Sequence, residues 1–434
     1  MNRSLRGWAV CVTLLSLLLS ACEKELFVLP RPEPVTLKIA RSYMVSYETS
    51  LIERFEEQYP YITIEITPPV PSYPYTNCSH NPDNCSEFDE VDVFSFGTWE
   101  LYALYEREVL MDLSVMLAES ETFNVDDMLP GIMSPFVVKG HLVGVPVGMV
   151  FQILYYNMDL FDRYGVDYPQ PDWSRDDFLN TAIALTHIDE GVFGYEPGNY
   201  IPWLLGYGMD FYEYTDTAVI PQFNNPKTVE TLEWYASLIY DSNVAPTMDQ
   251  AREMMTLVGN DFNAVRETGI YKEQLAIWHG SIMQTRQRNK QYANWPKRVG
   301  VVPMPERGTT KTVVSALGLA VSSKSHYPPE AWLWLEFITH NMPDTMYVPG
   351  RESQLTSDMY IQANGQEHVN TIQFIMRGEL DYGMGAAMPP PTEAVQQASG
   401  VLNDAILSVV NGERSASIAL EEAQRQAEQL LQGP

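Results

Sequence analysis

Basic residues are scarce in this sequence. Its 434 residues include 27 Lys and Arg but 56 Asp and Glu, which gives a formal net charge of −29 at pH 7. A protein that binds nucleic acid neutralises phosphates with clustered Lys and Arg side chains, and attachment to an anionic membrane surface needs the same residues. The charge balance therefore argues against a nucleic-acid partner and against electrostatic membrane binding.

Signatures of catalysis and nucleotide binding are missing as well. The sequence contains no G-x-S-x-G, H-E-x-x-H, P-loop or G-x-G-x-x-G pattern. Carboxylates gather in SEFDEVDVF, but glycoside hydrolysis needs two of them about 5–10 Å apart with separated pKa values, which closeness in sequence does not provide. We expect Glu87, Asp89 and Glu90 to form a solvated approach to a strand and Asp92 to be structural. We therefore expect a protein that is not an enzyme, with no catalytic residues, no cofactor and no metal.

Long apolar runs are confined to the N-terminus. Arg3 and Arg6 precede GWAVCVTLLSLLLSAC, which has the length of a signal-peptide core and is shorter than the about 20 residues of a transmembrane helix. Its ending, LSAC, resembles a bacterial lipobox, which predicts that residues 1–21 are a lipoprotein signal peptide and that Cys22 carries lipid. An ordinary signal peptide that happens to end near a cysteine is the alternative. Two or more acyl chains on Cys22 would anchor an exported protein stably to a membrane, at the cell surface or in the periplasm.

Cysteine is rare beyond this segment. Cys11 leaves with the signal peptide, so only Cys78 and Cys85, in NCSHNPDNC, remain free of lipid. In an oxidising compartment such a pair predicts a disulfide that closes a small loop. A metal site built from the two cysteines with His80 and Asp83 is the alternative.

Strands and helices alternate after a short tether. Residues 22–35 contain three prolines and predict a semi-extended linker. TLKIA, ITIEITP and DVFSF have the patterns of strands, whereas residues 46–59 and 100–114 have those of helices. This order predicts an α/β fold with a parallel sheet. Ligands of such sheets bind at the carboxyl ends of the strands, which draws attention to Ser42, Tyr43 and residues 97–99.

Separated segments of the chain resemble one family, in the order that the family has them. They are TLKIA…LIERFEEQYPYITIEI, DVFSFGTWELYALYEREVLMDLS, GVPVGMVFQILYYNMDLFDRYGVDYPQPDW, QLAIWHGS, GVVPMP…LGLAVSSKS…PEAWLWLEFIT and YVPGRES. The resemblance is to the extracellular solute-binding proteins of ABC importers, in the sugar-type family that includes maltose-binding protein. The sequence departs from it at Ala316–Leu317–Gly318, where many relatives carry a Gly pair, and at Ile282, where relatives carry an aromatic residue.

The resemblance implies a type II periplasmic-binding-protein fold, in which two α/β lobes are joined by a hinge and close on a ligand. Lobe one would comprise residues 36–148 and 299–342, and lobe two residues 149–298 and 343–434. The implied partners are a small-molecule ligand, most readily a sugar or oligosaccharide, and an ABC permease, and the implied state is a monomer. A lipid-anchored glycan hydrolase and a surface adhesin or scaffold with a degenerate cleft are the alternatives.

Aromatic residues near strand ends are the first candidates for ligand contact, because sugars present apolar C–H faces. Tyr43 follows the first strand, and Trp99 opens a helix after FSFG. Just past the proposed hinge, alternation along a strand places Tyr155 and Tyr156 on opposite faces. We expect Gln152 and Tyr155 to face the cleft and Tyr156 to face the core.

The remaining candidates lie further along the chain. Trp203 and Tyr207 are one helical turn apart, so they share a face that suits either stacking or the core. Trp278 and His279 end a strand, and we expect Gly280 and Ser281 to open a helix whose free N–H groups could bind ligand oxygens. His279 has no neighbour spaced for metal binding. Arg351, in PGRES, suits ligand contact and pairing with a carboxylate equally well.

Overall fold

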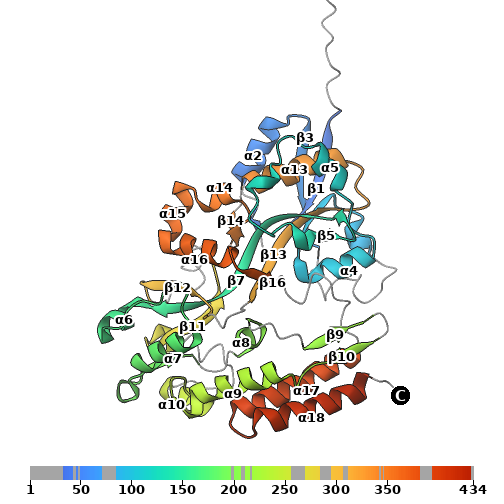
Figure 1. Cartoon of the computed structure of the whole chain (residues 1–434). Helices are drawn as coiled ribbons and strands as arrows, with labels where there is room; N and C mark the ends of the chain where they lie inside the picture. The colour runs from blue at the N-terminus through green and yellow to red at the C-terminus, as the bar shows by residue number, and fades with distance from the viewer. Residues whose placement is uncertain are drawn as a thin grey trace, which may run out of the picture.

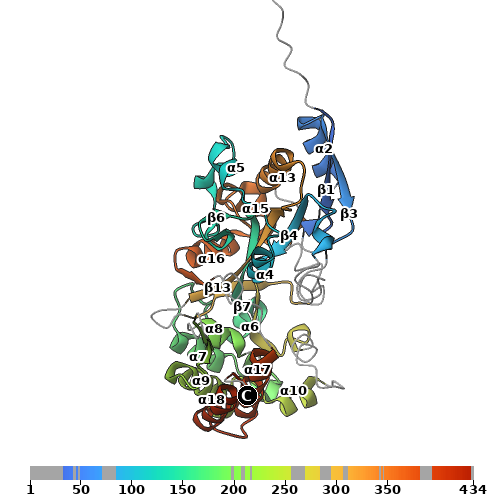
Figure 2. The same ribbon diagram turned by 90° about the vertical axis from the view of Figure 1, so that its right-hand side faces the viewer.

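The computed structural model describes residues 33–42, 45–46, 49–70, 85–196, 200–206, 211–215, 218–255, 269–283, 295–305, 311–341, 344–345, 347–381 and 393–431. These residues form an upper and a lower part in Figure 1, and strand β7 (Val145–Asn157) runs from one into the other. The view turned by 90° shows the same division, with β1 and β3 at the top and α17 and α18 at the bottom (Figure 2).

The upper part is built on a mixed sheet. Strands β1 (Val35–Ala40), β3 (Ile62–Thr67) and β4 (Val93–Gly97) are parallel, and β13 (Lys311–Val321) runs antiparallel to both β4 and β7. Its larger helices are α2 (Thr49–Gln58), α4 (Leu101–Glu106), α5 (Ser114–Glu119) and α13 (Pro328–His340). Leu51 and Phe55, one turn apart on α2, are buried in the core, so the helix predicted here packs through one apolar face.

One predicted helix is interrupted. The sequence pattern predicts a single helix over residues 100–114, but α4 ends at Glu106 and the next helix, α5, begins only at Ser114. Glu108 has φ of 54°, a left-handed backbone conformation that an α-helix does not contain. The chain therefore leaves the helix there, and Val109 and Leu113 are buried in the core below.

The lower part uses the second half of β7. That half pairs antiparallel with β11 (Leu275–Ser281) and β12 (Val299–Pro303), and β11 pairs parallel with β8 (Phe193–Tyr195). The helices of this part are α6 (Met158–Tyr164), α7 (Arg175–Ala184), α8 (Ile201–Gly206), α9 (Pro226–Tyr240), α10 (Met248–Met255), α17 (Glu393–Val410) and α18 (Ala416–Leu431). Ser174 caps α7 by accepting the Asp177 amide, and Pro226 occupies the first turn of α9.

Shorter elements complete the described chain. The strands are β2 (Val45–Ser46), β5 (Val137–Val138), β6 (His141–Leu142), β9 (Tyr212–Tyr214), β10 (Val219–Pro221), β14 (Asp344–Thr345), β15 (Val348–Pro349) and β16 (Glu379–Asp381). The helices are α14 (Glu352–Leu355), α15 (Asp358–Asn364) and α16 (Gln366–Met376), with single 3₁₀ turns η1 (Ser86–Phe88), η2 (Thr98–Glu100), η3 (Val125–Asp127), η4 (Ser134–Phe136) and η5 (Ile188–Glu190). Within the described ranges, no helix has the length and apolarity that crossing a membrane requires.

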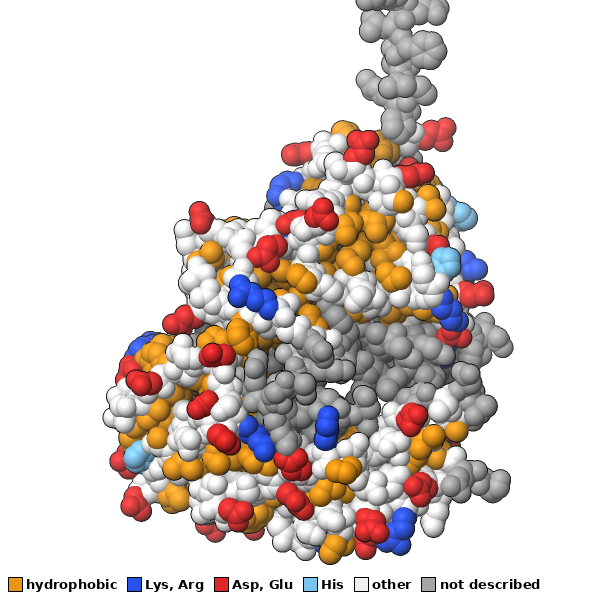
Figure 3. All heavy atoms as spheres, in the orientation of Figure 1, with side chains coloured by type: hydrophobic (Ala, Val, Ile, Leu, Met, Phe, Trp, Pro, Cys, Tyr) orange, Lys and Arg blue, Asp and Glu red, His pale blue; other side chains and the backbone are white. Residues whose placement is uncertain are grey.

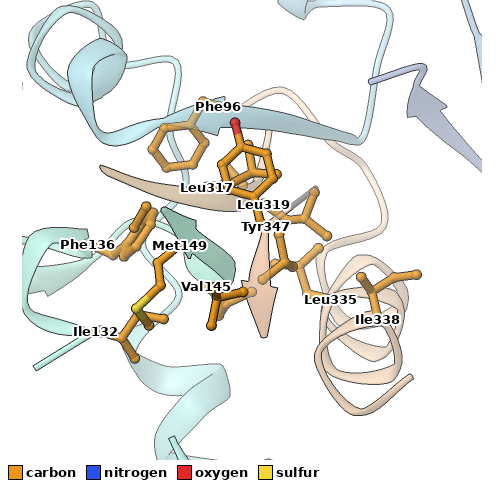
Figure 4. Close-up of a cluster of buried hydrophobic side chains, with 14 of the residues drawn as sticks. Phe96, Ile132, Phe136, Val145, Met149, Leu317, Leu319, Leu335, Ile338 and Tyr347 are labelled. Atoms are coloured by element: carbon orange, nitrogen blue, oxygen red, sulfur yellow. The ribbon is translucent and has the colours of Figure 1, made fainter. Parts of the chain in front are cut away.

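Two hydrophobic cores share β7. The first core gathers side chains from β4, β7, β13 and α13, among them Phe96, Met149, Leu317 and Leu335, which converge in Figure 4. The second core lies among the helices of the lower part, including α9, α17 and α18. Along β7, Val145, Val147, Met149, Phe151 and Ile153 belong to the first core, whereas Leu154 and Tyr156 belong to the second.

The α/β fold class predicted from the sequence is confirmed, and the lobe boundaries stay a prediction. The predicted lobe two includes α14 to α16, yet Leu355, Val369 and Ile372 bury their side chains in the first core. The first core also extends to Tyr155 and Trp278 in the lower part. The core packing therefore does not by itself divide the chain at the predicted residues.

A glycine permits the close pairing of β7 and β15. The two strands pair antiparallel, with Pro349 opposite Gly148. A Cβ atom on Gly148 would lie 2.7 Å from the Tyr347 Cβ and 2.9 Å from the Val348 carbonyl oxygen. Only glycine allows the strands to approach this closely, because the atoms in the way belong to backbone or to the first carbon of a side chain.

We expect Gly148→Ala to lower the free energy of unfolding by about 1–3 kcal/mol, since the added methyl group overpacks the contact between β7 and β15. Gly400→Ala is the matched control: nothing lies within 4 Å of its added Cβ in α17, and helix propensity should raise stability by about 0.5–1 kcal/mol. Urea unfolding of both variants measures the difference. Equal stability of the two would contradict the close approach at Gly148.

Candidate functional site

The carboxyl ends of β8 and β11 lie side by side in the lower part. The strands are parallel, with Ile277 opposite Tyr195, so Glu196 and His279 follow at the same edge of the sheet. This edge is where open α/β sheets bind ligands. The structure extends β11 through Ser281, so the prediction that Gly280 and Ser281 open a helix is wrong: both residues continue the ladder with β7.

Three aromatic rings pack at this edge, and we call them the aromatic cluster: Tyr155, Trp278 and Trp295. The Tyr155 and Trp278 rings lie offset at 6.1 Å between centroids, and Trp295 meets them edge-on at 5.3 Å and 5.2 Å. Tyr155 and Trp278 face each other across the β7–β11 ladder, which places them on one face of the sheet. Tyr156 lies on the opposite face, in the second core, as alternation predicts.

The aromatic cluster is closely packed. Tyr155 is 1% exposed and Trp278 is 0% exposed. The Tyr155 hydroxyl donates to the Ser281 carbonyl at 2.9 Å and accepts the Met283 amide at 3.2 Å. Nε1 of Trp278 is buried and has no hydrogen-bond partner among the described residues. Tyr155 thus fixes the turn that follows β11, and Trp278 retains an unused donor.

Polar groups adjoin the cluster. Gln152 is half-buried, and its amide nitrogen lies 3.4 Å from the Ser281 hydroxyl, directly across the ladder. Glu196 is 0% exposed, and its Oε1 accepts the His279 backbone N–H at 2.7 Å. Alternation places the Gln152 and Ser281 side chains on the face opposite Tyr155 and Trp278, so the predicted placement of Gln152 and Tyr155 on one face is wrong. The edge as a whole still offers an amide, a hydroxyl and the partly exposed Trp295 ring, groups that suit a ligand with apolar faces and hydroxyl groups.

The sequence analysis did not identify Glu196 or Trp295 as site residues, and it considered only the backbone N–H of Ser281, not its hydroxyl. Glu196 carries a signal in retrospect, because it stands between the strand FGY and the Pro-Gly pair that follows. Trp295 has no such signal, since only the strand pairing of β12 with β7 brings it beside Tyr155.

Trp203 lies in the second core. It is 1% exposed, its Nε1 donates to the Tyr195 hydroxyl at 2.8 Å, and its ring packs 4.7 Å from that of Trp234. This packing leaves no ring face for a ligand and argues against the stacking role that the sequence suggested. Tyr207, predicted on the same face, lies outside the described residues.

Arg351 is a structural residue in the upper part. At 1% exposure, it donates to the carbonyls of Phe123, Asn124 and Thr339 and to the Thr339 hydroxyl. Its Nη1 also lies 3.3 Å from Asp127 Oδ2, so of the two predicted roles the carboxylate pairing is present. Burial lowers the pKa of Arg351 from its ordinary value, with Asp127 acting against that effect.

Asp127 is held ionised by the same network. Its burial alone would raise the pKa, but hydrogen bonds from Ser353 and Arg351 outweigh burial and place the pKa of Asp127 below its ordinary value. Together these bonds tie the turn at residues 123–127 to α13 and α14. Asp92 is likewise structural, as predicted, because it accepts the Lys38 amide at 2.8 Å and the Ser325 hydroxyl at 2.6 Å.

The candidates of the upper part are described incompletely. Tyr43 lies outside the described residues, and only the backbone of Trp99 is described, in η2. The strand ends that carry them do meet, because the hydroxyls of Ser42 and Ser95 lie 2.7 Å apart. Glu100 is buried and accepts the Gly97 amide at 2.9 Å, which holds the end of β4.

The predicted disulfide and lipid sites fall partly beyond the described chain. Cys85 is disulfide-bonded, and its predicted partner Cys78, with His80 and Asp83, lies outside the described residues, as does Cys22. Over the described ranges, no group of three or more His, Cys, Asp or Glu side chains is arranged to hold a metal ion.

A comparison with known families decides the relationship. Residues 42–342, more than half of the chain, match the family described as bacterial extracellular solute-binding protein. The chain belongs to this family. Membership implies a place outside the cytoplasm, as predicted.

Solved structures of solute-binding proteins share the fold. A family 1 extracellular solute-binding protein of Alicyclobacillus acidocaldarius superposes with a TM-score of 0.69 at 15% identity, over 93% of this chain and 100% of that one. The substrate-binding protein Lmo0181 of Listeria monocytogenes, solved with cycloalternan, gives 0.64 at 19%, over 92% and 99%. A protein of Agrobacterium vitis with bound D-mannitol gives 0.59 at 18%, over 91% and 98%. The solute-binding fold with two lobes is therefore confirmed.

A curated relative matches over a shorter stretch. The mannitol-binding protein of Pseudomonas aeruginosa is 28% identical over 113 residues, which span 26% of this chain and 25% of that protein. On the face of the molecule shown in Figure 3, Asp and Glu side chains are spread over both the upper and the lower part.

We expect Arg351→Met to lower the free energy of unfolding by about 3 kcal/mol, because the change leaves several buried acceptors and Asp127 without their donor. Arg377→Met serves as the control, since Arg377 is exposed and its replacement should stay within about 0.5 kcal/mol of wild type. Denaturant unfolding at neutral pH measures both. A similar, small effect of the two changes would show that Arg351 has no structural role.

Proposed function

We propose that this protein is the lipid-anchored receptor of an ABC importer and that it binds a sugar, sugar alcohol or oligosaccharide between its lobes. The observation that carries the proposal is the family match over residues 42–342. Structures with this fold include proteins solved with maltose, with D-mannitol and with cycloalternan, and they cover at least nine-tenths of this chain. At the edge of the sheet, Gln152 and Ser281 supply polar groups and the aromatic cluster supplies rings, which together have the chemistry that such ligands require.

The ligand would contact both lobes. In the lower part we assign it to the edge formed by Gln152, His279, Ser281 and Trp295, with the buried Tyr155 and Trp278 rings supporting them from below. In the upper part we assign it to Tyr43 and Trp99, which follow the ends of β1 and β4. Trp203 and Arg351 are not included, because both are committed to packing.

Lobe closure would follow from differential affinity. A ligand shifts an open form to a closed one only to the extent that it binds the closed form more tightly. Here β7 is the strand that connects the two lobes, because its residues take part in both cores. The permease would then distinguish the closed, loaded receptor from the open one. We take lobe one as residues 36–148 and 299–342 and lobe two as residues 149–298 and 343–434, with α14 to α16 packing on the first core, and the receptor as a monomer.

A panel of solutes tests the function. Maltose, maltotetraose, D-mannitol and D-glucose, with L-leucine as a chemically unrelated control, are added to the mature chain and the melting temperature is measured. A compound present at 100 times its dissociation constant should stabilise the fold by about 2.7 kcal/mol. Release of a product from an oligosaccharide would identify a hydrolase, and stabilisation by none of a broad set of carbohydrates would favour a scaffold.

A cysteine replacement tests the anchor. We expect Cys22→Ser to move the protein from the membrane fraction to the soluble extracytoplasmic fraction, because the site of acylation is lost while the fold is untouched. Cys11→Ser, inside the predicted signal peptide, should leave the protein in the membrane fraction. Fractionation followed by mass spectrometry of the mature N-terminus measures this, and an unmodified wild-type Cys22 would refute the lipid anchor.

A further inference from the structure

Glu196 continues the β8–β11 ladder where β8 ends. The Glu196 backbone N–H donates to the Ile277 carbonyl at 3.1 Å, as the next rung of the parallel ladder requires. In a regular ladder the His279 N–H would then donate to a backbone carbonyl of the neighbouring strand. Here it donates to Oε1 of the Glu196 side chain at 2.7 Å.

The side chain therefore replaces a rung of the sheet. The 2.7 Å distance lies at the short end of the range of N–H···O hydrogen bonds. Glu196 is 0% exposed, so water does not compete for this bond. The last residues of β11 are thus fixed although the partner strand has ended.

The fixed residues are those of the candidate ligand site. Trp278 precedes His279 and packs with Tyr155 and Trp295. Ser281 follows two residues later and carries both the contact to Gln152 and the carbonyl that accepts from Tyr155. A movement of the His279 backbone would displace each of these groups together.

We propose that Glu196 is a positioning residue for ligand binding: its carboxylate holds the end of β11 so that Trp278, His279 and Ser281 keep the arrangement that a ligand meets. The expected effect on ligand affinity rests on the proposed function. The positioning of β11 rests on the Glu196–His279 hydrogen bond alone. Glu196 acts through the β11 backbone and does not need to touch the ligand.

Two replacements of similar size separate the acceptor from the volume of the side chain. Glu196→Gln keeps an acceptor oxygen, whereas Glu196→Leu fills the same space without one. Hydrogen exchange at the His279 amide is measured in the ligand-free proteins by NMR. We expect exchange to be at least tenfold faster in Glu196→Leu and close to wild type in Glu196→Gln.

Affinity gives the second measurement. Titration calorimetry with maltose and with D-mannitol should show at least a tenfold rise in Kd for Glu196→Leu and less than a threefold change for Glu196→Gln. Asp92→Leu is the matched control. Asp92 is also a buried carboxylate that accepts a strand amide, that of Lys38, but it lies at the amino end of β4, away from the strand ends proposed to bind ligand. We expect it to lower the melting temperature and to leave Kd unchanged.

Each result decides the proposal. Unchanged exchange at His279 in Glu196→Leu, or faster exchange with unchanged Kd, overturns it, and so does an equal loss of affinity in Glu196→Gln. If the wild-type chain binds neither compound, the proposed function fails for these ligands, whereas the exchange measurement still decides whether Glu196 holds β11. If Glu196→Leu does not fold, Glu196→Asp, which draws the carboxylate back by one methylene group, replaces it with the same expected direction.

Discussion

Strand β7 carries the backbone hydrogen bonds of both halves of the molecule. Its first half pairs with β13 and β15, and its second half with β11 and β12. The first core is built on one half and the second core on the other, with Leu154 and Tyr156 entering the second core while Tyr155 remains in the first. Because buried peptide groups must be paired, each half depends on β7 staying extended through the crossing. Gly148 contributes to this pairing, because a side chain there would prevent β15 from approaching β7.

Buried carboxylates hold the ends of other strands in the two parts that β7 connects. Asp92 accepts the Lys38 amide, Glu100 accepts the Gly97 amide, and Glu196 accepts the His279 amide. Burying a carboxylate is unfavourable unless hydrogen bonds compensate it. Two of these three bonds lie at strand ends that face the proposed ligand, and the third lies near the start of β4. The fold thus uses the same kind of hydrogen bond, from a strand or strand-end amide to a buried carboxylate, at three places.

The sequence predicts the elements well and the site only in part. Strands such as ITIEIT and the apolar face of α2 follow from local periodicity, which the tertiary structure reinforces. The helix predicted over residues 100–114 fails because the left-handed conformation of Glu108 has no sequence signal. Trp203 and Arg351 have residue types suited to binding, but whether an aromatic ring or a guanidinium faces a ligand or a core depends on packing between distant segments. Trp295 and Glu196 were missed for the same reason, because strand pairing alone brings them to the edge.

The alternation of Leu154, Tyr155 and Tyr156 between two cores also limits how the halves can move. A slip of β7 by one residue would turn each tyrosine to the other face of the strand, away from the core in which it packs, because side chains alternate along a strand. Sliding is therefore excluded at this crossing, and a change in the angle between the halves must be absorbed as twist and bend of an unbroken ribbon. A fixed register of β7 keeps Tyr155 in the first core and Tyr156 in the second.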